Sequence, residues 1–354
     1  MKTILATIFA IFFCIQLFAQ EKKIETIKIT DSIYVFKPYI DWVHGNGVAI
    51  IGSDGVFFID TYIQTNYAEE SIKKLKEITG LPVKYVLNTH WHNDHVMGNY
   101  AFKKAFPHCK FIGHDSTYIY MNRVIKAAID NELQTFKTDL EQSEKELKEK
   151  KTAGGTVING NMITFWENYI VAEKEYADNY QPNQFVNHDI TFNDKMTFRW
   201  GSQTIELMYD NNNGHSPGDV VVWIPEKKIV ITGDIIVGPT PYATYYNIPG
   251  MIKAIQKIID MNPSIIIPGH GVMLYDLSYP NLLKEAFAAY YNEAEKAVKN
   301  NTPVRDAMSS IKLNDIDMKF TGGDSLKEWA YRSFFARNVI YNTYRYNHAL
   351  PKKQ

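Results

Sequence analysis

Short apolar segments, each closed by a histidine or an aspartate, recur through this 354-residue chain and limit the folds open to it. Residues 83–87 are one such segment, which runs directly into His90 and its polar neighbours. Ahead of it, residues 48–51 and 56–59 flank Ser-Asp-Gly and predict a β-hairpin. Residues 66–79 have helical spacing and stop at a glycine. This alternation of strands and helices predicts a layered α/β domain.

Two further regions are predicted to be helical. Residues 116–151 read as one long helix that ends at a Gly-Gly pair, and residues 161–180 are mixed, with helix expected. From residue 281 to about 348 the pattern is again helical. Strands are expected between these regions and before the hairpin, at residues 27–39, 190–192, 196–200, 204–209, 220–224, 229–232 and 265–267. Residues 116–187 are therefore predicted to be an insertion, whose charged stretch is either a solvated helical face or a lid or dimerisation arm.

The N-terminus has the form of a secretory signal, with Lys2 followed by an almost wholly apolar run at residues 4–18 and the small residue Ala19. An uncleaved anchor is the alternative, although the run is short for a bilayer. We expect a signal peptide at residues 1–19, a catalytic domain at 20–275 and a helical extension at 276–354. The mature protein would be periplasmic or secreted, without stable membrane insertion. Signal removal would leave Cys109 without an intramolecular disulfide partner.

The charge balance argues against a nucleic-acid partner. Lysine plus arginine number 38 and aspartate plus glutamate 39, which gives a formal net charge of -1. Proteins that neutralise phosphates need a basic surface. A small-molecule substrate is the expected partner, and the sequence leaves the oligomeric state open.

The segment Thr-His-Trp-His-Asn-Asp-His places four metal-ligating side chains, His90, His92, Asp94 and His95, within six positions directly after a strand. Imidazole and carboxylate groups suit zinc and similar divalent ions. Two groups of ligands in one short loop suggest two neighbouring metals. Zinc is expected, with two ions per chain, while iron and manganese stay open.

Three more ligands close later strands. These are His215 after the strand at 204–209, Asp234 after the strand at 229–232 and His270 after the strand at 265–267. Glycines flank all three and let the backbone pass close to an ion. Each alone is as readily a turn residue, but together they predict one site.

These residues, in this order, resemble the metallo-β-lactamase superfamily over about residues 27–275. The resemblance implies a four-layer αβ/βα sandwich, here with a helical insertion and a helical C-terminal extension. It also implies that His90, His92 and His215 hold one metal, that Asp94, His95 and His270 hold the second, and that Asp234 bridges them.

A two-metal site of this kind lowers the pKa of bound water to about 7, so that a hydroxide attacks a carbonyl-type bond in an ester, lactone, thioester or amide. Asp94 is the expected catalytic residue, orienting the nucleophile or shuttling a proton. Asp60 is either a partner that orients a ligand histidine or a turn-capping aspartate. The aromatic residues near these motifs either line a substrate pocket or fill the core; they are Trp91, Trp166, Tyr242, Tyr245 and Tyr246.

Several reaction classes stay open at this point. A β-lactamase is an alternative, although one lactamase subclass carries cysteine where Asp234 stands and a lysine soon afterwards, both absent here. Iron flavoproteins usually carry glutamate at the position of His92, and persulfide dioxygenases use a single iron. The alternative from another class is a non-catalytic binding protein stabilised by metal, which seven candidate ligands disfavour because closed structural zinc sites need four.

Overall fold

The computed structural model describes residues 23–40, 43–243 and 247–347. The predicted signal peptide therefore lies outside the described residues, as do Tyr245 and Tyr246. In the part of the chain that is described, none of the helices combines the length and apolarity that a membrane crossing requires.

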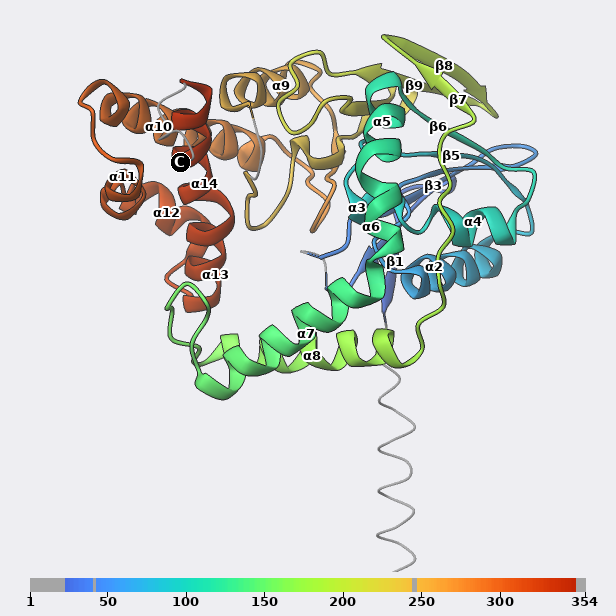
Figure 1. Ribbon diagram of the computed structural model, residues 1–354. Coiled ribbons are helices and arrows are strands. Elements are labelled where there is room, and N and C mark those ends of the chain that lie inside the picture. The colour runs from blue at the N-terminus through green and yellow to red at the C-terminus, as the bar shows by residue number, and fades with distance from the viewer. Residues whose placement is uncertain (1–22, 41–42, 244–246, 348–354) are drawn as a thin grey trace, which may run out of the picture.

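Two β-sheets form the centre of the fold (Figure 1). The first has seven strands in sequential order, antiparallel from β1 to β4 and parallel from β4 to β7. Its strands are β1 Ile24–Lys28, β2 Ile33–Pro38, β3 Gly47–Ile51, β4 Val56–Ile59, β5 Val83–Leu87, β6 Lys110–His114 and β7 Ile190–Phe192. The second has five strands in the order β12-β11-β10-β9-β8, with only β11 and β12 parallel. Its strands are β8 Lys195–Trp200, β9 Gln203–Tyr209, β10 Val220–Ile224, β11 Ile229–Ile231 and β12 Ile265–Ile267.

The two sheets pack face to face, and helices cover both outer faces. Strand β4 illustrates this layering. Its Phe57 and Ile59 point into the core between the sheets, while Val56 and Phe58 point outward against helix α2. A strand buried on both faces reads as an unbroken apolar run. Helices α2 (Thr65–Ile78) and α4 (Asn99–Ala105) cover the first sheet, and α9 (Ile248–Asp260) and α10 (Ser278–Lys299) cover the second. The predicted four-layer αβ/βα sandwich is confirmed.

Two predicted elements differ in the structure. The single strand expected at 27–39 is two paired strands, because Thr30, Asp31 and Ser32 make a tight turn in which Ile29 and Thr30 donate to the carbonyl oxygen of Ile33. The long helix expected at 116–151 is interrupted, since a π-helical turn follows its first two turns and Asn131 leaves the helical backbone conformation. The segments are α5 Asp115–Tyr120, η1 Met121–Ile125, α6 Lys126–Asp130 and α7 Glu132–Glu149.

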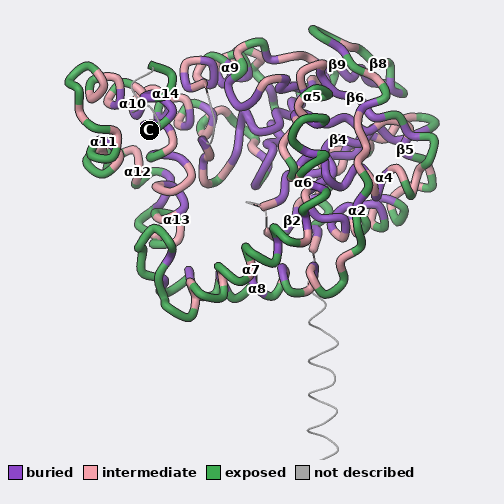
Figure 2. The backbone as a smooth tube through the Cα atoms, in the orientation of Figure 1, coloured by how far each residue is buried: buried purple, intermediate pink, exposed green. Residues whose placement is uncertain are grey.

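Helix α7 pairs with α8 (Asn161–Asp178) to form an arm that projects from the sandwich (Figure 1). The charged face of α7 is exposed (Figure 2), which fits the solvated helical face among the interpretations that the sequence left open. The C-terminal helices are α11 Val304–Ser310, α12 Asn314–Thr321, α13 Ser325–Ala330, η4 Tyr331–Ala336 and α14 Arg337–Tyr346. The far end of the arm packs on this extension, where Asn161 donates to Asp324 at 2.9 Å and Trp166 contacts Trp329. Two regions distant in the sequence thus meet to one side of the sandwich (Figure 1).

Candidate metal centre

The loop after β5 positions four of the predicted ligands. His90 and His92 precede helix α3 (Asn93–Val96), and Asp94 and His95 lie in its single turn. Asn88, the first residue after the strand, donates from Nδ2 to the carbonyl oxygen of His95 at 2.8 Å. This bond folds the loop back on itself, so that residues on both sides of the turn face one edge of the sandwich.

The other three ligands arrive at the same edge from the second sheet. His215 lies between β9 and β10, in a turn where the carboxylate of Asp219 accepts from the backbone amides of His215 and Ser216. Asp234 lies in the 3₁₀ turn η3 (Gly233–Ile235) after β11, and His270 follows β12. Gly269 permits the close approach of these loops, because a Cβ there would lie 2.1 Å from Oδ1 of Asp234.

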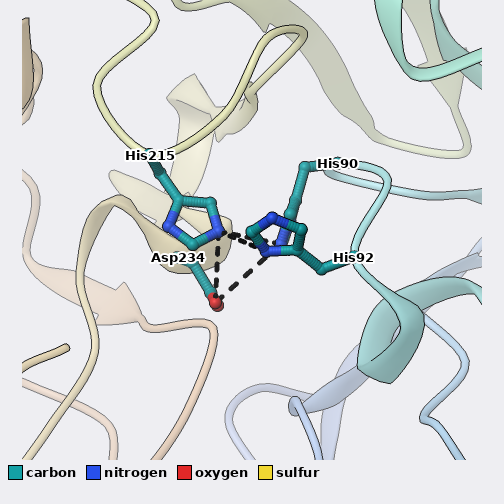
Figure 3. A group of neighbouring side chains, drawn as sticks. All are labelled: His90, His92, His215 and Asp234. Atoms are coloured by element: carbon teal, nitrogen blue, oxygen red, sulfur yellow. Dashed lines mark hydrogen bonds and ion pairs between the residues drawn. The ribbon is translucent and has the colours of Figure 1, made fainter. Parts of the chain in front are cut away.

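One group of four donors consists of His90, His92, His215 and Asp234, with ligand atoms all within 4.8 Å of one another (Figure 3). Nε2 of His215 lies 3.0 Å from Nε2 of His90 and 2.9 Å from Nδ1 of His92. Oδ2 of Asp234 lies 3.8 Å from Nε2 of His90 and 3.5 Å from Nε2 of His215.

A second group consists of Asp94, His95, His270 and the same Asp234. Nε2 of His95 lies 3.3 Å from Nε2 of His270, from Oδ2 of Asp94 and from Oδ1 of Asp234. Nε2 of His270 lies 3.0 Å from Oδ2 of Asp94 and 3.5 Å from Oδ1 of Asp234. Asp234 thus presents one oxygen to each group, which is the bridging position that the family resemblance implies.

Both groups fit a divalent ion. Four ligands at zinc distances of about 2.0–2.1 Å in a tetrahedron lie about 3.3 Å from one another, close to the separations here. Burial lowers the pKa of His90, His92 and His215, so their imidazoles are neutral and their lone pairs converge. Converging lone pairs repel one another unless a cation lies between the nitrogens. The fold therefore carries two histidine and aspartate clusters able to bind metal ions.

In the second group, the nearby carboxylates determine the direction in which the pKa of each histidine shifts. Burial alone would lower the pKa of His95 and of His270, but the surrounding aspartates outweigh it and raise both. The same ion pairs hold the pKa of Asp94 and of Asp234 well below the usual range despite their burial. Without a metal, these two histidines carry protons that a metal must displace.

Asp60 contacts the second group through the ring nitrogen of His95 that does not face the other donors. Its Oδ2 lies 2.8 Å from Nδ1 of His95 and accepts from Oγ1 of Thr89 at 2.8 Å, and its Oδ1 accepts from the amide of Thr89. Asp60 has φ of 59°, an uncommon conformation for a residue other than glycine. Of the two interpretations left open by the sequence, the structure favours the partner that orients a ligand histidine.

The centre opens into a pocket of about 640 Å³. Asp94, His92, Asp234 and His270 lie at its base, and the arm and the C-terminal helices form much of its wall. Among the predicted aromatic residues, Trp91, Trp166 and Tyr242 line this pocket. Trp166 also packs in a small apolar cluster, so both interpretations hold for it.

Sequence reasoning missed several residues that fix the loops. Asn46 donates from Nδ2 to the carbonyl oxygens of Pro268 and Gly271, which holds the His270 loop against the first sheet. His188, given no role from the sequence, lies 3.0 Å from Oδ1 of Asn88. His44, also given none, is buried and stacked on Tyr67. The one sequence feature that could have pointed to Asn46 and Asn88 as loop-fixing residues is their position next to the end of a strand.

Comparisons with known proteins agree with this architecture. The profile of the Metallo-beta-lactamase superfamily matches residues 40–270. A comparison with curated protein sequences finds no match. Among solved structures, a metallo-beta-lactamase from Pontibacter korlensis is 19% identical with a TM-score of 0.51, covering 75% of this chain and 99% of that one.

The sec-alkylsulfatase Pisa1 from Pseudomonas sp. is 14% identical with a TM-score of 0.61, and the match covers 91% of this chain and 50% of that one. The chain therefore spans about half the length of this sulfatase. A DIM-1 metallo-beta-lactamase structure is 17% identical with a TM-score of 0.51, covering 75% of this chain and 97% of that one. Identities this low show a shared fold and no more. With its profile match, its sandwich and its two clusters of ligands, this chain belongs to the metallo-beta-lactamase superfamily.

Proposed function

We propose that this protein is a hydrolase with two metal ions, most simply zinc, that cleaves a carbonyl-type bond in an ester, lactone, thioester or amide. The observation that carries the proposal is Asp234, whose two oxygens face two separate groups of donors. A structural zinc site is closed by four ligands, whereas seven side chains here converge at the base of an open pocket.

The chain's own residues have distinct tasks in this reaction. The bound ions would supply Lewis acidity and a water of lowered pKa. Asp94 is partly exposed to the pocket, and its Oδ2 faces His95 and His270. We assign to the Asp94 carboxylate the positioning of the attacking water and the transfer of its proton to the leaving group. Water is thereby added across the acyl bond, and the leaving group departs with the proton.

A sulfate ester is the second candidate substrate. The match to the sec-alkylsulfatase covers 91% of this chain, so it includes most of the arm and the extension, while the lactamase matches cover 75%. A β-lactam is the third, supported by the family alone.

A substrate panel tests the proposal. The protein loaded with zinc would be assayed on a phenyl ester, a lactone, a thioester, a secondary alkyl sulfate and a cephalosporin, beside the Asp94→Asn variant. We expect turnover of at least one carbonyl substrate and a loss of at least 100-fold in kcat for the variant, measured at zinc concentrations that saturate both donor groups. Zinc-loaded protein that is inert on the carbonyl substrates but cleaves the sulfate would replace the first candidate with the second.

We also propose that the protein is exported, on the basis of its N-terminal sequence. The measurement is N-terminal sequencing of protein recovered from the cell envelope and medium. Cleavage after Ala19 is expected, and an intact N-terminus in the cytoplasmic fraction would contradict export.

A further inference from the structure

The wall of the pocket comes largely from outside the loops that hold the ligands. The arm contributes residues from α7 and α8, and the preceding segments η1 and α6 contribute others. The C-terminal extension contributes Trp329 from α13 and Phe334 from η4. A volume of about 640 Å³ is in the range of pockets that enclose most of a drug-sized molecule. The substrate therefore has room to extend well beyond its reacting bond.

An aromatic wall lines this space without a break. Tyr242 contacts Phe334 with ring centroids 5.9 Å apart, and Phe334 contacts Trp329 at 5.4 Å. The series continues from Trp329 to Trp166 at 4.8 Å and from Trp166 to Phe165 at 5.2 Å. These five rings, here called the aromatic wall, run from the loop after Asp234 to the arm. They present apolar surface to whatever occupies the pocket.

Away from the metal centre, the described part of the pocket lining carries no cationic side chain that could pair with an anionic group. None of the described residues that line the pocket is a lysine or an arginine. A carboxylate buried against aromatic rings without a counter-ion is strongly disfavoured.

The described lining residues also include no carboxylate outside the metal centre that is free to select a cation. Apart from Asp94 and Asp234 at the metal centre, the only acidic residue among the described lining residues is Glu146. Its Oε2 accepts from Nε1 of Trp166 at 3.2 Å and its Oε1 accepts from the amide of Ala153 at 2.9 Å. Both oxygens are thus engaged in holding the arm together.

We propose that the part of the substrate remote from the scissile bond is a large, uncharged apolar group, such as a medium or long acyl chain, that lies against the aromatic wall. This inference rests on the proposed hydrolase function and names its substrate class. It separates this protein from enzymes whose substrates carry a charged group far from the reacting bond.

The test uses p-nitrophenyl esters of increasing acyl length with the zinc-loaded full-length mature protein. Each buried methylene is worth about threefold in kcat/KM, so we expect the octanoyl ester to exceed the butanoyl ester by roughly 50- to 100-fold. Esters of equal length that end in a carboxylate or in a trimethylammonium group serve as matched controls, and both should lose at least tenfold. A preference for either charged ester, or a flat series among esters that are cleaved, would overturn the inference.

A binding measurement separates this inference from the reaction itself. Alkyl methyl ketones cannot be hydrolysed, and their binding is measured by isothermal titration calorimetry. We expect the dissociation constant to fall by about threefold per methylene, with or without zinc. Trp329→Ala should reduce the ratio between long and short ketones, and Trp329→Phe should restore it. Length-dependent binding without any ester hydrolysis would sink the proposed function and leave the pocket assignment standing, whereas length-independent binding would sink the pocket assignment.

Discussion

A buried carboxyl group in the arm gives a sharp prediction about stability. Glu173 on α8 accepts from Nε2 of Gln64 at 2.9 Å, and both residues are only 1% exposed. Their other side-chain oxygens, Oε2 of Glu173 and Oε1 of Gln64, are buried and have no hydrogen-bond partner in the described part of the chain. Burial, with a smaller contribution from Asp139, raises the pKa of Glu173 from 4.5 to about 7.

The arrangement of Glu173 and Gln64 favours the protonated form of the Glu173 carboxyl group. A protonated carboxyl facing an amide can donate to the amide oxygen while it accepts from the amide nitrogen, which would satisfy both unpartnered oxygens. A carboxyl whose pKa is raised on folding stabilises the folded state below its unfolded pKa, and this stabilisation is lost as the pH rises through the folded value. For a rise from 4.5 to about 7, the loss amounts to about 3 kcal/mol between pH 4.5 and 8.

Glu173→Gln removes the titration and keeps the shape, because the second glutamine carries permanently the hydrogen that the carboxyl gains only at low pH. Measured by urea unfolding, the variant should match the native protein within about 1 kcal/mol at pH 5 and exceed it by about 2–3 kcal/mol at pH 9. The control is Glu175→Gln on the same helix, whose ion pair with Lys23 is partly exposed and contributes little at either pH.

Two results would refute this reasoning. One is a difference between Glu173→Gln and the native protein that stays constant from pH 5 to pH 9. The other is a variant that is less stable at pH 9, which would mean that the ionised carboxylate is the form the arm requires.

Three further predictions concern the metal centre. Asp60→Asn tolerates the unusual backbone but removes the carboxylate from His95, so metal affinity should fall about 10- to 100-fold in competition with a chromogenic chelator, and an unchanged affinity would contradict the assigned role. Gly269→Ala places a Cβ against Oδ1 of Asp234, so elemental analysis should find fewer than two zinc ions per chain; two retained ions would count against a bridging Asp234. Because His95 and His270 hold protons that a metal displaces, zinc affinity measured by titration should be at least tenfold weaker at pH 6 than at pH 8, and affinity independent of pH would be inconsistent with this set of ligands.

Local patterns predicted the sandwich well because each strand carries its own signal. The run at β4 is apolar on both faces since it is buried on both, and the face of α2 at Ala68, Ile72 and Leu75 packs as its spacing predicts. The ligands were found for a related reason, since a histidine or aspartate that ends a buried strand lies at the edge of the sheet. Strand β6 escaped prediction because only Phe111 and Ile112 in it are large and apolar.

Long-range contacts left no such signal. Trp166 and Trp329 are far apart in the sequence, and nothing in either segment indicates that they touch. The interruption at Asn131 was missed because helical spacing continues on both sides of it. The link between Glu173 and Gln64 likewise depends on where the arm returns to the sandwich, which no local pattern specifies.

The residues that the sequence predicted and those that it missed have different roles in the protein: the first are the metal ligands, and the second include part of the aromatic wall. All seven candidate ligands lie within the segment that matches the superfamily profile, while Trp329 and Phe334 of the aromatic wall lie beyond it. Ligands set the type of reaction, which many substrates satisfy, and the wall decides which molecule reaches them. The two should therefore be separable: Trp329→Ala should change the preference among esters and leave two zinc ions bound, whereas Gly269→Ala should reduce the zinc content and turnover of every ester alike. A variant at either position that changed both the preference among esters and the zinc content would show that the wall and the metal centre are not separable.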